Sequence, residues 1–122
     1  MTNEKVPKIL VVEDMEEWVE LWKDVLYGAA ELIGAASIEE AEEKFAANPD
    51  IDVVVVDGCV PGSELNTIPL VQKFKATFKG PMIAVSGNPD FQKMLIKEGC
   101  SHECEKKDLP EFLRTIGIFD YM

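Results

Sequence analysis

Several apolar runs of the chain end in side chains that could do chemistry. The residues are Glu13 and Asp14 after the first run, Asp57 after the third, Ser86 after the fourth, and Lys106 and Lys107 after the fifth. Open α/β sheets bind ligands beyond the carboxyl ends of their strands. A single acid at such a position is ordinarily a solvated loop residue, but several at one rim indicate a functional site.

Three of these side chains, Glu13, Asp14 and Asp57, are carboxylates. If they lay within about 5 Å of one another, each pair would repel by about 3 kcal/mol at an effective dielectric constant of about 20. An ion pair with a half-exposed lysine would offset only about 0–1 kcal/mol of this repulsion. A magnesium ion takes hard oxygen ligands and keeps several waters. The sequence therefore predicts a Mg²⁺ site, provided that the first and third strands are neighbours.

The elements that would position these residues follow from the hydrophobic pattern. Strand-like runs recur at 8–12, 31–36, 51–56, 81–85 and, more weakly, 101–105. Between them, apolar residues at helical spacing occupy the segments 18–26, 38–45 and 71–78. Alternating strands and helices predict an α/β fold with a parallel sheet that helices cover on both faces.

Helix boundaries carry local signals of their own. Ser37 with Glu40, and Asp108 with Glu111, have the spacing of N-terminal capping pairs. Pro69 suits the first turn of a helix, which predicts that the third helix starts near Thr67.

Length, composition and charge exclude several classes of protein. The chain has 122 residues, 47% of them hydrophobic, and a net charge of −11. This predicts one domain over residues 1–122, with a core that needs no disulfide or metal. Nucleic acid and membrane surfaces are poor partners for so acidic a chain, and no signal segment is present at its start, so we expect a cytoplasmic protein with reduced cysteines.

The sequence resembles the receiver domain of two-component response regulators over essentially its whole length. The resemblance rests on four segments in order: 8–14 (KILVVED), 53–57 (VVVVD) followed by Pro61-Gly62, 84–87 (AVSG), and a lysine that begins the last loop. It implies a doubly wound, flavodoxin-like, three-layer α/β/α fold with a five-stranded parallel sheet in the order 2-1-3-4-5.

By this resemblance Asp57 is the phosphoacceptor. Asp14 and Asp57 would bind Mg²⁺ directly, Glu13 would help through water, and the backbone carbonyl of Cys59 would be the third protein ligand. A carboxylate can attack phosphorus only if cationic groups offset the charge on the phosphoryl oxygens. Among the catalytic residues, the Ser86 hydroxyl and the Lys106 ammonium would each meet one of those oxygens.

The resemblance also implies partners. His102 is the chain's only histidine and does not lie on a helix beside a nucleotide site, so the phosphoryl donor would be a histidine kinase or a histidine phosphotransfer protein. The protein would catalyse only its own phosphorylation and dephosphorylation and would not be an enzyme. We expect no output domain, so the signal would leave by contact with a downstream protein or by onward phosphotransfer.

Two positions depart from the family pattern. In the family, an aromatic residue on the last strand, three residues before the lysine, turns inward after phosphorylation. Here that position holds Glu103, or Cys104 if Lys107 is the matching lysine. The usual Lys-Pro pair is Lys106-Lys107, so either lysine could serve. These departures keep an alternative open: a pseudo-receiver of the same fold that binds proteins without being phosphorylated.

Other types of site fit less well. Cys100, His102 and Cys104 would share one face of a strand and could ligate zinc, but a structural zinc site needs four ligands. A dehalogenase-type phosphatase would carry its nucleophilic Asp after the first strand with a second acid two residues on. A flavin binder would need a glycine- and hydroxyl-rich loop where this chain has Glu13–Glu17.

Overall fold

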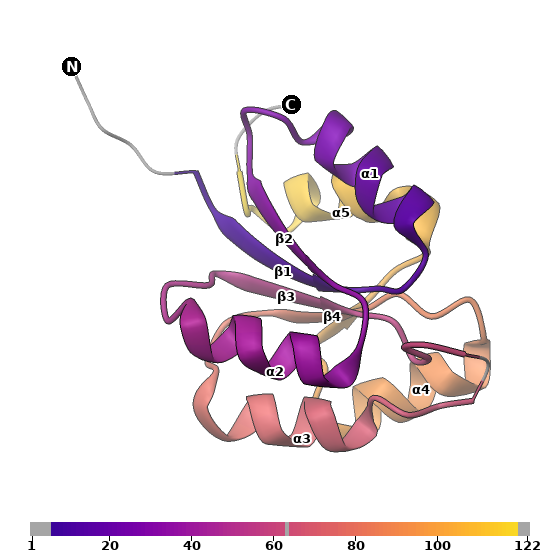
Figure 1. Ribbon diagram of the computed structural model, residues 1–122. Coiled ribbons are helices and arrows are strands. Elements are labelled where there is room, and N and C mark those ends of the chain that lie inside the picture. Colours follow the sequence, from indigo (N-terminus) through magenta and orange to yellow (C-terminus); the bar gives the residue numbers. More distant parts are fainter. Residues whose placement is uncertain (1–5, 63, 120–122) are drawn as a thin grey trace.

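The computed structural model describes residues 6–62 and 64–119, and its centre is a parallel sheet of five strands (Figure 1). The strands are β1 (Lys8–Val12), β2 (Glu31–Ala35), β3 (Val53–Val56), β4 (Met82–Ala84) and β5 (His102–Glu103). Their order is β2-β1-β3-β4-β5. The expected α/β fold and strand order are therefore confirmed, and β1 and β3 are neighbours.

Helices cover both faces of the sheet (Figure 1). α1 (Glu16–Val25) and α5 (Leu109–Thr115) lie on one face, and α2 (Ile38–Ala47), α3 (Ile68–Thr77) and α4 (Pro89–Glu98) lie on the other. A short 3₁₀ turn, η1 (Lys106–Asp108), leads into α5. No helix in the described part of the chain is long and apolar enough to span a membrane.

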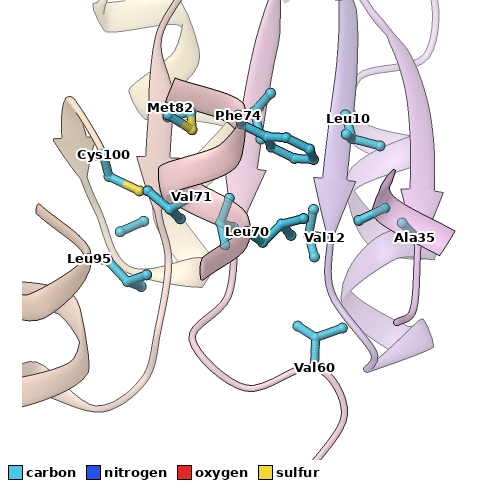
Figure 2. Packing of buried hydrophobic residues seen from close by; sticks show 14 of the residues in the cluster. Leu10, Val12, Ala35, Val60, Leu70, Val71, Phe74, Met82, Leu95 and Cys100 are labelled. Carbon is cyan, nitrogen blue, oxygen red and sulfur yellow. The ribbon is translucent and has the colours of Figure 1, made fainter. Parts of the chain in front are cut away.

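Two hydrophobic clusters, one on each face, hold the layers together. Side chains alternate along a strand, so Leu10 and Val12 of β1 pack with the helices α2, α3 and α4, whereas Ile9 and Val11 pack with α1 and α5. Figure 2 shows the first cluster, which includes Phe74 of α3 and Leu10 and Val12 of β1. Burying each such side chain stabilises the fold by about 1.5–3 kcal/mol. The central strands are thus clamped from both sides, and the residues that follow them inherit fixed positions.

The capping signals have mixed outcomes. Ser37 caps α2, because its Oγ accepts a hydrogen bond from the Glu40 N–H at 3.1 Å, while the Glu40 carboxylate accepts from the Ala36 N–H at 2.7 Å. Thr67 is the N-cap residue of α3, as expected. The Asp108 prediction is wrong: this residue precedes α5, but its side chain makes no capping hydrogen bond. It ends the turn η1 and lacks the extended backbone that an N-cap normally has.

The fifth strand is shorter than the run 101–105 predicted, and this overturns the zinc interpretation. β5 pairs only with β4 and spans two residues, so both cysteines lie outside the strand. Cys100 consequently packs in the cluster beside α3 and α4, whereas Cys104 packs against the cluster beside α1 and α5. The two thiols lie on opposite faces, and burial raises the pKa of each to about 12.

Candidate functional site

The neighbouring strands β1 and β3 bring the three predicted carboxylates together. Val12 and Val56 are paired at the ends of these strands, so Glu13 and Asp57 leave the sheet side by side. One carboxylate oxygen from each of Glu13, Asp14 and Asp57 lies within 4.8 Å of the others. This is the point where the strand order reverses, which is the expected ligand position in a doubly wound sheet.

Lys106 faces this carboxylate cluster from the first residue of η1. Its Nζ lies 2.9 Å from Glu13 Oε1 and 3.3 Å from Asp57 Oδ2. Lys107 is exposed to solvent. The geometry therefore selects Lys106, not Lys107, as the lysine at the carboxylates, a choice that counting along the sequence left open.

The site is short of positive charge. The Glu13 side chain is fully buried and that of Asp57 is 10% exposed. Burial raises the pKa of both carboxyls, although the nearby Lys106 ammonium acts in the opposite direction. Burial lowers the pKa of Lys106, but its hydrogen bond with Glu13 and the charge of Asp57 outweigh that effect, so its pKa is raised. Three carboxylates face one ammonium, which is an environment that suits a divalent cation.

The backbone around Asp57 orients its carboxylate. The Gly58 N–H donates to Asp57 Oδ1 at 2.7 Å, so the other oxygen, Oδ2, is the one that meets Lys106. Cys59 is half-buried two residues on. Burial, and then the charges of Asp57 and Asp14, raise the pKa of its thiol.

Ser86 lies beside the residue that follows Asp57. It is buried just after β4, and its Oγ would be 3.3 Å from a Cβ atom placed on Gly58. The same Oγ accepts a hydrogen bond from the Asn88 N–H at 3.2 Å. The structure thus brings Ser86 to the same rim as Asp57 and Lys106, as the strand order predicts.

No protein-family model matches the chain, and no curated protein matches it either. Solved structures do match. A response regulator receiver domain from Clostridium thermocellum is 24% identical, with a TM-score of 0.72 over 90% of this chain and 93% of that one. A CheY-like receiver domain from Methylobacillus flagellatus is 21% identical, with a TM-score of 0.74 over 92% and 99% of the two chains.

A third match is the BeF3-activated N-terminal receiver domain of Klebsiella pneumoniae RstA. It is 21% identical, with a TM-score of 0.71 over 88% of this chain and 96% of that one. The chain has the receiver-domain fold. Its acidic cluster lies where the sheet order of that fold places the ligand site.

A cavity of about 780 Å³ opens beside the carboxylates of this receiver fold. Ser86 and Lys106 form part of its wall, together with Trp18 of α1, Gln92 of α4 and Glu103 of β5. Glu103, at the position where the resemblance leads one to expect an aromatic residue, is exposed and lines this cavity.

Thr67 contributes to the site in a way that reading the sequence missed. Its fully buried Oγ1 donates to the backbone carbonyl of Asp57 at 2.9 Å, with the Gly58 carbonyl at 3.2 Å. The sequence marked Thr67 only as the start of a helix. Its partners are backbone atoms ten and nine residues away, and no local pattern identifies such a contact.

We predict that Thr67→Val lowers the free energy of unfolding by about 1–3 kcal/mol, because the buried Asp57 carbonyl loses its donor while the side-chain shape is kept. The Gly58 carbonyl still accepts from the Asn66 N–H at 2.9 Å. Urea denaturation measures the change. Thr115→Val is the matched control, since the Thr115 hydroxyl also donates to a carbonyl, that of Glu111, but at the surface. An equal loss of stability in both variants would contradict the assigned role of Thr67.

Proposed function

We propose that this chain is a phosphoacceptor receiver of a two-component or phosphorelay signalling system in the cytoplasm. It would take a phosphoryl group onto Asp57 from the phosphohistidine of a histidine kinase or a histidine phosphotransfer protein. One observation carries this proposal: the Asp57 carboxylate lies within 4.8 Å of two further carboxylates and 3.3 Å from the Lys106 ammonium. The receiver-domain fold of the solved structures above supports it.

The chemistry assigns a distinct task to each side chain. An oxygen of the Asp57 carboxylate forms a bond to phosphorus as the bond from phosphorus to the donor imidazole nitrogen breaks, and the electron pair of that bond leaves with the imidazole. Charge spreads over the phosphoryl oxygens during this step. The Lys106 ammonium and the Ser86 hydroxyl would each stabilise one such oxygen, and such electrostatic positioning is the main source of catalysis.

The charge balance of the site supports a magnesium requirement. Asp14, Asp57 and the Cys59 carbonyl would hold Mg²⁺ directly, and Glu13 would do so through water. When bound, Mg²⁺ would offset the charge of the carboxylates and of the incoming phosphoryl group. The cluster offers three carboxylates, two of them buried, against one ammonium group, and carboxylate oxygens are ligands that this ion takes.

The phosphoryl donor would be a second protein. The chain's only histidine, His102, lies on β5, where its ring contacts Phe112 edge-on and its Nδ1 is 2.8 Å from the Ser101 hydroxyl. It is absent from the carboxylate cluster and from the lining of the cavity beside it. Output would be contact with a downstream protein or onward transfer of the phosphoryl group.

A pseudo-receiver that binds proteins without phosphorylation is the second candidate. The exposed Glu103 at the family's aromatic switch position, and Lys107 in place of the usual proline, favour it.

One experiment separates the two functions. The protein is incubated with Mg²⁺ and acetyl phosphate, and its intact mass is measured. The receiver function predicts one added phosphoryl group, which is retained in the surface variant Asp24→Asn and absent in Asp57→Asn. A wild-type protein that gains no adduct from acetyl phosphate or from histidine kinases would be a pseudo-receiver.

A further inference from the structure

Gln92 of α4 is a buried amide whose hydrogen bonds all go to the backbone near the proposed phosphorylation site. Its Oε1 accepts from the Ser86 N–H at 2.8 Å. Its Nε2 donates to the carbonyls of Ala84 and Cys104, each at 3.1 Å. With 8% of its surface exposed, it is one of only five buried polar residues in the described part of the chain.

The three partners of this amide lie at the ends of two neighbouring strands, β4 and β5. Ala84 is the last residue of β4, and Ser86 follows two residues later. Cys104 comes directly after β5 and two residues before Lys106. The pairing of β4 with β5 ends at Ala84 and Glu103. At this point the Cys104 N–H also donates to the Ala84 carbonyl, at 3.1 Å, so Gln92 reinforces the connection between the two chain segments at the end of the strand pairing.

Ser86 depends on this connection for its position. The residues after it are Gly87 and Asn88, and a Cβ atom on Gly87 would meet nothing within 4 Å, so no other group packs against that side of Gly87. Gln92 binds the backbone N–H of Ser86, and the Ser86 hydroxyl itself accepts one hydrogen bond, from the Asn88 N–H at 3.2 Å. A bond that fixes the Ser86 backbone N–H also fixes the direction in which its hydroxyl points.

We propose that Gln92 is a positioning residue for phosphoryl transfer, acting through Ser86, an inference that rests on the function proposed above. The donor half of the amide anchors the side chain to both strands. The acceptor half holds Ser86 so that its hydroxyl is in place for a phosphoryl oxygen. Gln92 itself does not contact the reacting atoms.

The expected effect is on the rate of phosphorylation. Displacing a catalytic group by about 1 Å can cost up to about a hundredfold in rate. Gln92→Leu keeps the side-chain size and removes all three hydrogen bonds, so we expect the rate with acetyl phosphate and Mg²⁺ to fall on the order of tenfold. Gln92→Glu keeps an acceptor for the Ser86 N–H but loses both donated bonds, and its rate should lie in between.

A double-mutant cycle separates positioning from a general structural role. The rates of wild type, Gln92→Leu, Ser86→Ala and the double variant are compared, and thermal denaturation verifies that each is folded. If Gln92 acts through Ser86, adding Gln92→Leu to Ser86→Ala changes the rate by less than about twofold, because interacting sites are not additive. Gln72→Leu on α3 is the control, since the exposed Gln72 amide binds only Glu98.

The experiment distinguishes failure of the Gln92 role from failure of the receiver function. If Gln92→Leu lowers the rate equally with and without the Ser86 hydroxyl, or leaves the wild-type rate unchanged, the positioning role is wrong and the receiver function stands. If Gln92→Leu fails to fold, the same cycle with Gln92→Glu decides. A wild-type protein that takes no phosphoryl group overturns the receiver function, and the role of Gln92 with it.

Discussion

Replacing Lys106 by methionine is expected to lower the free energy of unfolding by about 3 kcal/mol, because breaking a buried ion pair leaves an uncompensated charge. The Lys106 ammonium faces Glu13 at 2.9 Å and Asp57 at 3.3 Å, and the Glu13 side chain has no exposed surface. Burial already raises the pKa of Glu13, so this carboxyl takes up a proton readily when its partner is removed. The loss should therefore lie at the lower end of the range for buried pairs.

Urea denaturation at pH 7 with a chelator present measures this loss. Lys107→Met is the matched control, since the adjacent lysine is exposed and its replacement should change stability by less than about 0.5 kcal/mol. Adding Glu13→Gln to Lys106→Met should recover part of the lost stability. Equal effects of Lys106→Met and Lys107→Met would show that Lys106 is not the partner of the buried carboxylates.

The same Lys106 variant should phosphorylate far more slowly. Removing one charge-stabilising donor typically costs about 10²–10³ in rate. With acetyl phosphate and Mg²⁺, we expect a loss on the order of a hundredfold for Lys106→Met and none for Lys107→Met. Intact-mass time courses measure both rates, and a Lys106→Met variant as fast as wild type would remove Lys106 from the catalytic residues.

Magnesium is expected to stabilise the protein through the carboxylate cluster. A ligand that binds only the folded state at one hundred times its dissociation constant stabilises it by about 2.7 kcal/mol. Asp14→Ala should abolish this gain because it removes one of three carboxylates that lie within 4.8 Å of one another. In the presence of a chelator, the variant should be at least as stable as wild type, since a repelling charge has been removed.

Thermal denaturation with and without Mg²⁺ tests this, and tryptophan fluorescence gives a second readout because Trp18 lines the cavity that also contains Lys106. Asp24→Ala, which removes a carboxylate on the exposed side of α1, is the control and should keep the full response to Mg²⁺. A response in Asp14→Ala as large as that of wild type would refute the metal site.

Much of the fold was predictable because its signals are local. The fully apolar runs at 9–12 and 53–56 predicted central strands covered on both faces, and both are completely buried. The Ser37 cap and the start of α3 directly after Thr67 are likewise short-range features. The Asp108 cap and the length of β5 were wrong because the backbone after β4 and β5 is set by tertiary packing, which overrides local preference.

The candidate site divides along the same line. Glu13, Asp14, Asp57 and Ser86 were predicted from the sequence, because they are polar residues at strand ends and parallel strands end at the same edge of the sheet. Which of two adjacent lysines turns inward depends on the path of η1, and the contacts of Thr67 and Gln92 depend on helices docked against distant backbone. The amino-acid sequence by itself determines the hydrophobic periodicity and the residues at which strands end. Hydrogen bonds between segments far apart in the chain form only when the helices pack against the sheet.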